Sequence, residues 1–315
     1  MARLSPAPRM VLVLSECWTM TSPRDLRALV GLAAEAEDAG FDAVMLSEHV
    51  VLGTGADANG LMANSREYAL PGNQNPAMPW PDSQVLLAAI AARTTTLRLF
   101  AAAVIAPLRH PLALAKSLAT LDLLSEGRLV VLPTPSWHAA EYAALGVPFS
   151  QRGERLDEHL AAWQLAWGPS PASFHGRHYS FDDVYVEPKP HRPGGVALHF
   201  GSSSMHEKLI ARIVRYGSGV NPLGRLSQDD LGRLAAAMRA AGREPAELEL
   251  VGGTRASFRD DRSVADLGTA LAAIPEQMAQ GFTTFCLKPS QFTDDARAVG
   301  PLCREVIARV SAMRG

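Results

Sequence analysis

The chain has 315 residues, of which 47% are hydrophobic, and its formal net charge is −2. A chain of this size can bury a large core without disulfide or metal cross-links, and one α/β barrel reaches this length. The near-zero charge argues against a nucleic-acid-binding protein. The three cysteines are scattered and odd in number, which favours reduced thiols in a cytoplasmic protein over a disulfide framework.

The distribution of apolar residues along the sequence does not suggest a membrane protein. No apolar run approaches the length that crosses a bilayer, and the N-terminus lacks the apolar run of a signal peptide. We therefore expect a soluble protein of the cytoplasm, with a small molecule as its partner rather than nucleic acid or a membrane.

Short apolar segments alternate with helical patterns eight times along the chain. The predicted strands are 10–14, 43–46, 97–105, 129–132, 196–200, 218–220, 248–251 and 283–287. The predicted helices are 24–39, 82–93, 110–124, 151–167, 204–215, 229–241, 264–280 and 294–313. Ser22-Pro23 is expected to cap the first helix, and Gly40 to end it. Eight strand–helix pairs predict a closed parallel (β/α)8 TIM barrel.

The structural rival is a doubly wound open sheet. That fold normally has a Gly-x-Gly-x-x-Gly turn after its first strand, whereas this chain has Ser15-Glu16-Cys17-Trp18 there. No flexible linker is apparent, so we expect a single domain over 1–315. Two long irregular insertions, at 53–81 and 168–195, follow strands 2 and 4 in this scheme. Both are predicted to lie over the active-site face, where loops after the strands converge.

The segment from Ala113 to Glu158 carries a specific pattern. It contains Ser125-Glu126-Gly127-Arg128, then Leu145-Gly146-Val147, then Arg152-Gly153. This segment resembles the luciferase-like family of flavin and deazaflavin oxidoreductases. The resemblance implies a (β/α)8 barrel that binds a redox cofactor.

Glu48 and His49 follow the second predicted strand. A histidine at the carboxyl end of a barrel strand lies at the mouth, and its pKa suits proton transfer. The alternative is a histidine that satisfies a buried backbone group. The resemblance implies an active-site role for His49 in Glu48-His49-Val50. Glu48 is the less certain partner, because adjacent strand residues face opposite ways.

Gly201, Ser202 and Ser203 lie between the fifth strand and the helix after it. Small residues at a helix N-terminus expose amides that bind anions, although an ordinary serine cap has the same composition. The resemblance implies that this segment holds the cofactor phosphate, although relatives have a second glycine where this chain has Ser202. Gly252-Gly253-Thr254, after the seventh strand, is a second candidate.

Three further positions are expected to shape the pocket. Relatives have a bulge or a non-proline cis peptide at the end of the third strand, which implies that Ala103 and Val104 pack on the cofactor ring. Relatives have a glycine-rich loop ending in tryptophan after the fourth strand; here Trp137 is kept but Pro133 and Pro135 stiffen the loop. Trp18 is either a pocket wall or a packing aromatic.

The sequence contains no His-Glu-x-x-His or Cys-x-x-Cys motif, so no metal site is expected. Within the family, Glu48-His49-Val50, Arg109-His110-Pro111 and Phe174-His175-Gly176 most resemble the group that uses the deazaflavin coenzyme F420. The resemblance thus implies an F420-dependent oxidoreductase that transfers a hydride to or from a small organic substrate. The alternatives are an FMNH2-dependent monooxygenase that uses O2, and a non-catalytic flavin-binding barrel. A homodimer is possible in either case.

Overall fold

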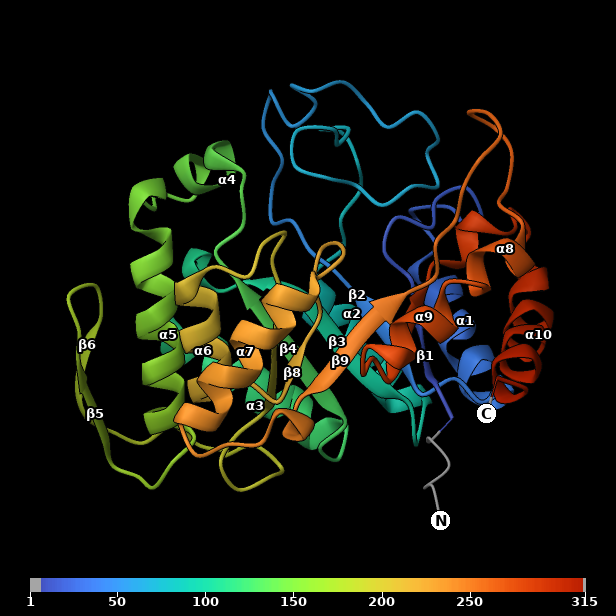
Figure 1. Cartoon of the computed structure of the whole chain (residues 1–315). Helices are drawn as coiled ribbons and strands as arrows, with labels where there is room; N and C mark the ends of the chain where they lie inside the picture. The colour runs from blue at the N-terminus through green and yellow to red at the C-terminus, as the bar shows by residue number, and fades with distance from the viewer. Residues whose placement is uncertain (1–6, 314–315) are drawn as a thin grey trace, which may run out of the picture.

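The computed structural model of the chain describes residues 7–313, so the prediction about the start of the chain concerns residues outside this range. Eight parallel strands close into one barrel in the order β1-β10-β9-β8-β7-β4-β3-β2, and β2 pairs with β1 (Figure 1). They are β1 Arg9–Val13, β2 Ala43–Leu46, β3 Arg98–Ile105, β4 Leu129–Thr134, β7 Ala197–Phe200, β8 Gly219–Val220, β9 Glu249–Gly253 and β10 Thr284–Leu287. The predicted barrel is confirmed, including the weak sixth strand, which is only two residues long in the structure.

Helices surround the barrel (Figure 1). They are α1 Leu26–Ala39, α2 Ser83–Arg93, α3 Pro111–Leu124, α4 Ala139–Ala144, α5 Arg152–Ala166, α6 Glu207–Tyr216, α7 Gln228–Ala240, α8 Leu267–Leu271, α9 Ile274–Ala279 and α10 Val299–Ser311. Short 3-10 turns lie at Ala106–Leu108, Phe149–Gln151, Pro245–Glu247, Pro289–Gln291 and Ala296–Ala298.

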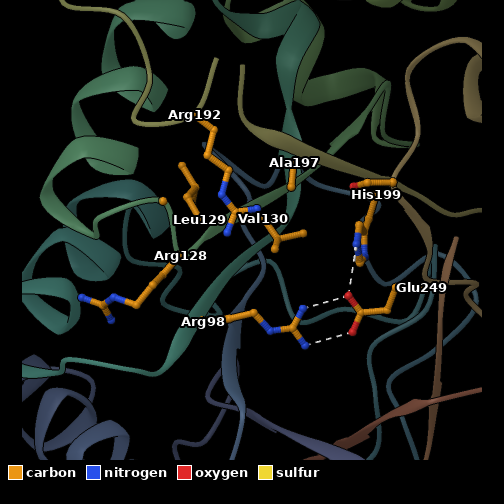
Figure 2. A pocket seen from close by; sticks show the side chains of 10 residues that line it. Arg98, Arg128, Leu129, Val130, Arg192, Ala197, His199 and Glu249 are labelled. Carbon is orange, nitrogen blue, oxygen red and sulfur yellow. Dashed lines mark hydrogen bonds and ion pairs between the residues drawn. The ribbon is translucent and has the colours of Figure 1, made fainter. Parts of the chain in front are cut away.

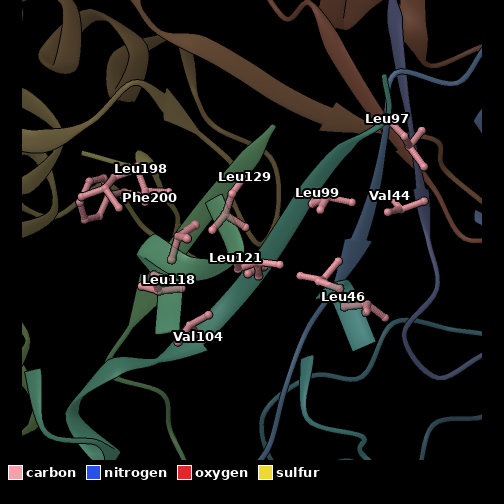
Figure 3. Packing of buried hydrophobic residues seen from close by; sticks show 14 of the residues in the cluster. Val44, Leu46, Leu97, Leu99, Val104, Leu118, Leu121, Leu129, Leu198 and Phe200 are labelled. Atoms are coloured by element: carbon pink, nitrogen blue, oxygen red, sulfur yellow. The ribbon is translucent and has the colours of Figure 1, made fainter. Parts of the chain in front are cut away.

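The core has two layers because the strands are buried on both faces. In β1, Val11 and Val13 belong to an inner cluster made of strand residues alone, whereas Met10 and Leu12 belong to the cluster shared with the helices. Figure 3 shows this outer layer between β3, β4 and α3. Burial of both faces explains why the strands have continuous apolar sequences rather than alternating ones.

Local signals explain where most helices begin and end. Gly40 has a left-handed φ of 93° and ends α1 as predicted. The start of α1 was predicted wrongly: Asp25, not Ser22-Pro23, caps it and accepts a hydrogen bond from the Ala28 amide. The predicted helix 264–280 is instead two short helices, since Pro275 lacks the N–H that a continuous helix needs and lies in the first turn of α9.

The long segment between the fourth and fifth barrel strands is present, but its predicted position over the mouth is wrong. It leaves the end of α5, not the end of a strand, and a helix that runs antiparallel to the strands ends at the opposite face of the barrel. Its hairpin, β5 Ala172–His175 and β6 Ser180–Val184, lies along the outside of α5 (Figure 1). None of its residues lines the mouth cavity.

A cluster of charges closes the other end of the barrel, where the strands begin. Arg98 donates two hydrogen bonds to the Glu249 carboxylate, at 2.8 and 2.9 Å, and the His199 Nε2 lies 3.6 Å from it (Figure 2). Burial alone would raise the pKa of Glu249, but the hydrogen bonds and charge of Arg98 outweigh it and lower the pKa to about 2. Burial lowers the pKa of His199 to about 4, although the nearby carboxylate opposes this shift.

Both depressed pKa values predict a fold that loses stability in acid. As the pH falls, the unfolded chain binds protons before the folded one, near the ordinary pKa of each group. The contribution of these two groups to the free energy of unfolding is therefore complete above about pH 6.5. For His199 it is lost between 6.5 and about 4, and amounts to on the order of 3 kcal/mol. Urea unfolding of the His199→Phe variant should show a weaker pH dependence in this window than the parent protein. The same pH dependence of the unfolding free energy in the variant and the parent would contradict this role of His199. The control is His175→Phe, because the His175 side chain is exposed.

Candidate active site

A cavity of about 930 Å³ opens at the carboxyl ends of the strands. This is within the range, roughly 300–1,000 Å³, that is typical of sites for drug-sized ligands and cofactors. Its wall combines residues that follow six of the eight strands with residues of the other two. The first set is Glu16, His49, Trp137, Gly201, Asn221 and Thr254, and the second is Ala103 of β3 and Cys286 of β10. Loops after the strands of a closed parallel barrel converge at one face, which explains how distant segments share this wall.

The whole loop between β2 and α2, residues 47–82, contains the predicted insertion 53–81 and is called the first insertion from here on. It covers the mouth and is fastened to the C-terminal part of the chain. The Asn64 side-chain amide donates to the carbonyls of Asp260 and Ser263, at 3.0 and 2.9 Å. The fully buried Lys288 ammonium donates to the Glu67 carbonyl at 3.0 Å. The insertion is therefore a fixed roof of the cavity, and its residues 68–80 supply part of the wall.

His49 lies in this cavity wall and is held by a carboxylate. Its Nδ1 is 3.2 Å from the Oε2 of Glu141, a fully buried residue of α4. The other Glu141 oxygen accepts the amides of Val50 and Val51, at 2.6 and 3.2 Å. A carboxylate that already accepts two amides favours a proton on the His49 Nδ1, which leaves the Nε2 lone pair free.

Glu48 lines the cavity, but its carboxylate is fully engaged. It accepts two hydrogen bonds from Arg109, at 2.7 and 3.1 Å, one from the Ile105 amide at 2.8 Å and one from the Ser83 hydroxyl at 3.1 Å. This arrangement ties β2 to the end of β3 and to the start of α2. It favours a positioning role for Glu48 over the acid–base role expected from the sequence.

The end of β3 contains the feature expected there. The Ala102–Ala103 peptide is cis, and the register with β4 shifts between Ala102 and Val104. Ala102 and Ala103 line the cavity. Val104 does not: it is fully buried in the outer cluster between the barrel and the helices, so its predicted contact with a cofactor ring is wrong (Figure 3).

The loop after β4 keeps Trp137 at the cavity in spite of its prolines. Trp137 meets the His49 ring edge-on, with centroids 6.0 Å apart, and Trp80 does the same at 5.3 Å. Ser136 has a positive φ of 56°, and the Tyr142 hydroxyl donates to the Pro135 carbonyl at 2.5 Å. These contacts fix the loop in a conformation that keeps Trp137 in the cavity wall, although Pro133 and Pro135 stiffen it.

The segment after β7 differs in one respect from its prediction. Helix α6 begins at Glu207 and is capped by His206, so Ser202 and Ser203 precede the helix and do not form its N-terminus. Gly201 lines the cavity, and a Cβ there would lie 1.8 Å from the Asn221 carbonyl oxygen. Only glycine allows this approach of two loops. Within the described chain, no protein acceptor binds the amides of Ser202 and Ser203, which leaves them available to an anion.

The second candidate for an anion site has fewer free donors. The Gly253 amide donates to the Gln277 side chain at 3.1 Å, and the Thr254 amide donates to the Cys286 carbonyl at 2.9 Å. A Cβ on Gly252 would lie 2.2 Å from the Gln277 Oε1. These glycines allow close packing of α9 against β9, and the geometry favours the segment after β7 as the anion site.

Two aromatic candidates lie outside the site. Trp18 packs against the outer core and is not among the residues that line the cavity, so the structure favours its reading as a packing aromatic. His110 caps α3, where its Nδ1 accepts the Leu112 amide at 3.3 Å. This agrees with the predicted start of the helix 110–124.

Several contacts of the site have no recognisable signal in the sequence. The contact between Glu141 and His49 is one, because the two residues are 92 positions apart in the sequence. Glu16 and Lys288 are another pair, with 3.7 Å between the carboxylate and the ammonium. Burial raises the pKa of Glu16, and the Lys288 charge opposes this shift. His138 accepts the Gly53 amide at 2.7 Å, and burial lowers its pKa.

Two other properties bear on the class of site. Over residues 7–313, no group of histidine, cysteine and carboxylate side chains has the arrangement of a metal site. In the same part of the chain, no helix has the length and apolar character needed to cross a membrane.

A closed parallel barrel with a deep cavity, a bulged third strand and a histidine–carboxylate pair at the mouth is typical of barrel enzymes that bind an organic cofactor. The chain belongs to the luciferase-like monooxygenase family, whose model matches residues 10–300. This family comprises oxidoreductases and monooxygenases, as the resemblance implied.

Individual relatives and structural neighbours include both FMNH2-dependent and F420-dependent enzymes. An FMNH2-dependent dimethylsulfone monooxygenase of Pseudomonas putida is 31% identical over 186 residues, which cover 58% of this chain and 45% of that protein. This match therefore spans less than half of the relative's length. A monooxygenase from Streptomyces bottropensis has a similar fold, with a TM-score of 0.72 and 19% identity over 96% of this chain and 99% of that one. The F420-dependent tetrahydromethanopterin reductase of Methanopyrus kandleri does too, with a TM-score of 0.66 and 15% identity over 97% and 100%.

We expect the ion pair between Glu48 and Arg109 to contribute to the stability of the protein. Removing one partner of a buried ion pair leaves the other charge without compensation, which typically costs roughly 3–5 kcal/mol. Arg109→Met should therefore lower the free energy of unfolding by about 3 kcal/mol, measured with urea at pH 7. The double variant Glu48→Gln/Arg109→Met should recover at least half of this loss. Additive effects of the two changes would show that the pair is not coupled.

Proposed function

We propose that this protein is an F420-dependent oxidoreductase that transfers a hydride between the deazaflavin and a small organic substrate. The observation that carries the proposal is His49, whose Nδ1 is bound to the buried Glu141 while its Nε2 stays free at the cavity. Oxidation of an alcohol, or reduction of a carbonyl, needs a positioned group that takes or gives the proton on oxygen as the hydride moves.

The residues present fit a cofactor of this kind. The cavity has the volume for a flavin-like ring, and the bulge at Ala102 and Ala103 brings backbone to its wall. The phosphate would be held by the side chain of Arg225, which lines the cavity, and by the amides of Ser202 and Ser203, which directly follow the cavity residue Gly201 without lining the cavity themselves. When bound, the deazaflavin supplies two-electron hydride chemistry and lacks the ring nitrogen that supports reaction with O2.

The protein's own part in the reaction is proton transfer and orientation. His49 would accept the hydroxyl proton of an alcohol substrate at Nε2, and in the reverse direction it would donate that proton to the carbonyl oxygen. Glu141 would stabilise the imidazolium that forms and would hold the ring in place. Trp80 and Trp137 contact the ring edge-on and restrict its rotation. The roof formed by 47–82 would exclude water from the reacting atoms.

One observation favours a second candidate, an FMNH2-dependent monooxygenase. The relative from Pseudomonas putida, at 31% identity, is described as FMNH2-dependent. The same cavity and phosphate segment would serve FMN, so the choice between the two rests on the cofactor itself.

A titration with F420 and with FMN tests the cofactor and its phosphate site together. The parent protein should bind F420 at least tenfold more tightly than FMN. Ser203→Asp, which sets a carboxylate beside the phosphate, should weaken binding at least tenfold, on the order of 1.4 kcal/mol. Ser203→Ala is the matched control and should bind as the parent does, because the amide is kept. Tighter binding of FMN would support the monooxygenase; unchanged affinity of Ser203→Asp would exclude this phosphate site.

The role of His49 is tested by single-turnover kinetics once a substrate is in hand. Removing a positioned acid–base group typically slows the chemical step on the order of a hundredfold to ten-thousandfold. His49→Ala should show this loss and keep cofactor affinity within a few-fold. The control is His110→Ala, which should lower stability through the lost cap of α3 and leave the chemical step unchanged. A His49→Ala variant as fast as the parent would refute the assignment, and cofactor binding without any turnover would favour a non-catalytic barrel.

A further inference from the structure

Two buried polar groups of the first insertion lack partners in the cavity wall. Gln74 is 6% exposed, and its side-chain oxygen is buried without a hydrogen-bond partner among residues 7–313. The Nε1 of Trp80 is also buried without a partner. Both residues line the mouth cavity, where Trp80 contacts the ring of His49.

A buried polar group without a hydrogen-bond partner lowers the stability of the folded protein. More than about 90% of buried polar groups have a hydrogen-bond partner, and an unpaired one costs about 1–3 kcal/mol. The backbone around Gln74 is well ordered by its own contacts, since its amide donates to the Ala56 carbonyl at 3.0 Å. A fixed side chain with a buried, unpaired oxygen at the wall of a ligand cavity is explained when a ligand donates a hydrogen bond to that oxygen.

The chemistry of the two groups defines what would complete them. A glutamine amide presents one acceptor and one donor side by side, so it pairs with a ligand edge that offers a donor beside an acceptor. The Trp80 indole N–H donates only, so it needs a further acceptor. The rings of Tyr68, Trp80 and Trp137 in the same wall suit a flat molecule.

Most charged groups of the wall are paired within the protein, which favours a neutral ligand. Three carboxylates line the cavity: Glu48 binds Arg109, Glu16 lies 3.7 Å from Lys288, and Glu276 lies 3.5 Å from Arg255. Two arginines line it, and Arg255 is the partner of Glu276. Arg225, the other, belongs to the loop after β8 and is assigned above to the cofactor phosphate. Neither Gln74 nor Trp80 carries a charge, and a charged substrate would be left without a counter-ion beside them.

We propose that Gln74 and Trp80 recognise the substrate, and that the substrate is a neutral planar heterocycle with a cyclic amide or imide edge. This inference rests on the proposed function, because it places the substrate in the cavity that holds the cofactor. The N–H of the ring donates to the Gln74 oxygen, the adjacent ring carbonyl accepts from the Gln74 nitrogen, and Trp80 donates to a ring carbonyl.

The pyrimidinedione part of a flavin or deazaflavin carries the same edge, so the cofactor is a second source of this chemistry. The roof position of Gln74 favours the substrate, since Ala103 and Gly201, the residues assigned to the cofactor, lie at the ends of barrel strands. The test therefore measures the two ligands separately.

Calorimetric titration with uracil and with 1,3-dimethyluracil provides the test, because the dimethyl compound keeps both carbonyls and lacks both N–H donors. Each probe is titrated into the protein with and without saturating cofactor. The parent protein should bind uracil at least tenfold more tightly than dimethyluracil. Gln74→Leu should lose this preference and bind dimethyluracil within twofold of the parent. Gln280→Leu, the same change elsewhere in the cavity wall, is the matched control and should keep the preference.

Trp80→Phe keeps the ring and removes the N–H, so it tests the proposal through a second residue. It should weaken uracil binding several-fold even if Gln74→Leu fails to fold. Equal affinity of the parent for both probes, or a preference that survives both substitutions, would overturn the proposal. Loss of F420 or FMN affinity in Gln74→Leu, with the uracil preference intact, would assign the amide to the cofactor instead. Failure of the parent to bind either cofactor would refute the proposed function, and the titrations without cofactor would still decide on Gln74.

Discussion

The site depends on one buried carboxylate. Glu141 has no exposed surface, and its two oxygens join three groups that are about 90 residues away in the sequence. It accepts the amides that begin the first insertion and holds the ring of His49. A buried carboxylate without hydrogen-bond donors would cost free energy, and here three donors satisfy its two oxygens. The interaction therefore fixes the path of the insertion and the orientation of the proposed acid–base group together.

The insertion that begins at this carboxylate is fastened at its far side as well. Asn64 binds carbonyls of the segment after β9, and Lys288 binds the Glu67 carbonyl and lies 3.7 Å from Glu16. The roof thus connects the early strands of the barrel to the last two. A roof held at both sides encloses the cavity without a separate lid domain, and it brings Gln74 and Trp80 above the ends of the strands.

The sequence predicted the barrel well because its signals are local. Continuous apolar runs such as 43–46 mark strands buried on both faces, and Gly40 marks the place where the backbone ends a helix. The break at Pro275 is an equally local signal, but the predicted helix 264–280 ran through it. It predicted the site less well because the partners are set by tertiary contacts. No local pattern links Glu141 to His49, or distinguishes the engaged carboxylate of Glu48 from a free one. Val104 is next to a residue of the cavity wall, and the bulge decides which of the two faces inward. The segment 168–195 has the irregular composition of a mouth loop, but it follows α5, and a helix that runs antiparallel to the strands ends at the opposite face of the barrel.

The direct measurement of the central claim is the tautomer of His49, observed by long-range ¹H–¹⁵N NMR of histidine-labelled protein. The resonances can be assigned by their loss in His49→Ala. If the Glu141 carboxylate orients the ring, neutral His49 carries its proton on Nδ1, and Glu141→Gln alters this state because an amide presents both a donor and an acceptor. A ring protonated on Nε2 in the parent protein, with the same spectrum in Glu141→Gln, would contradict the account.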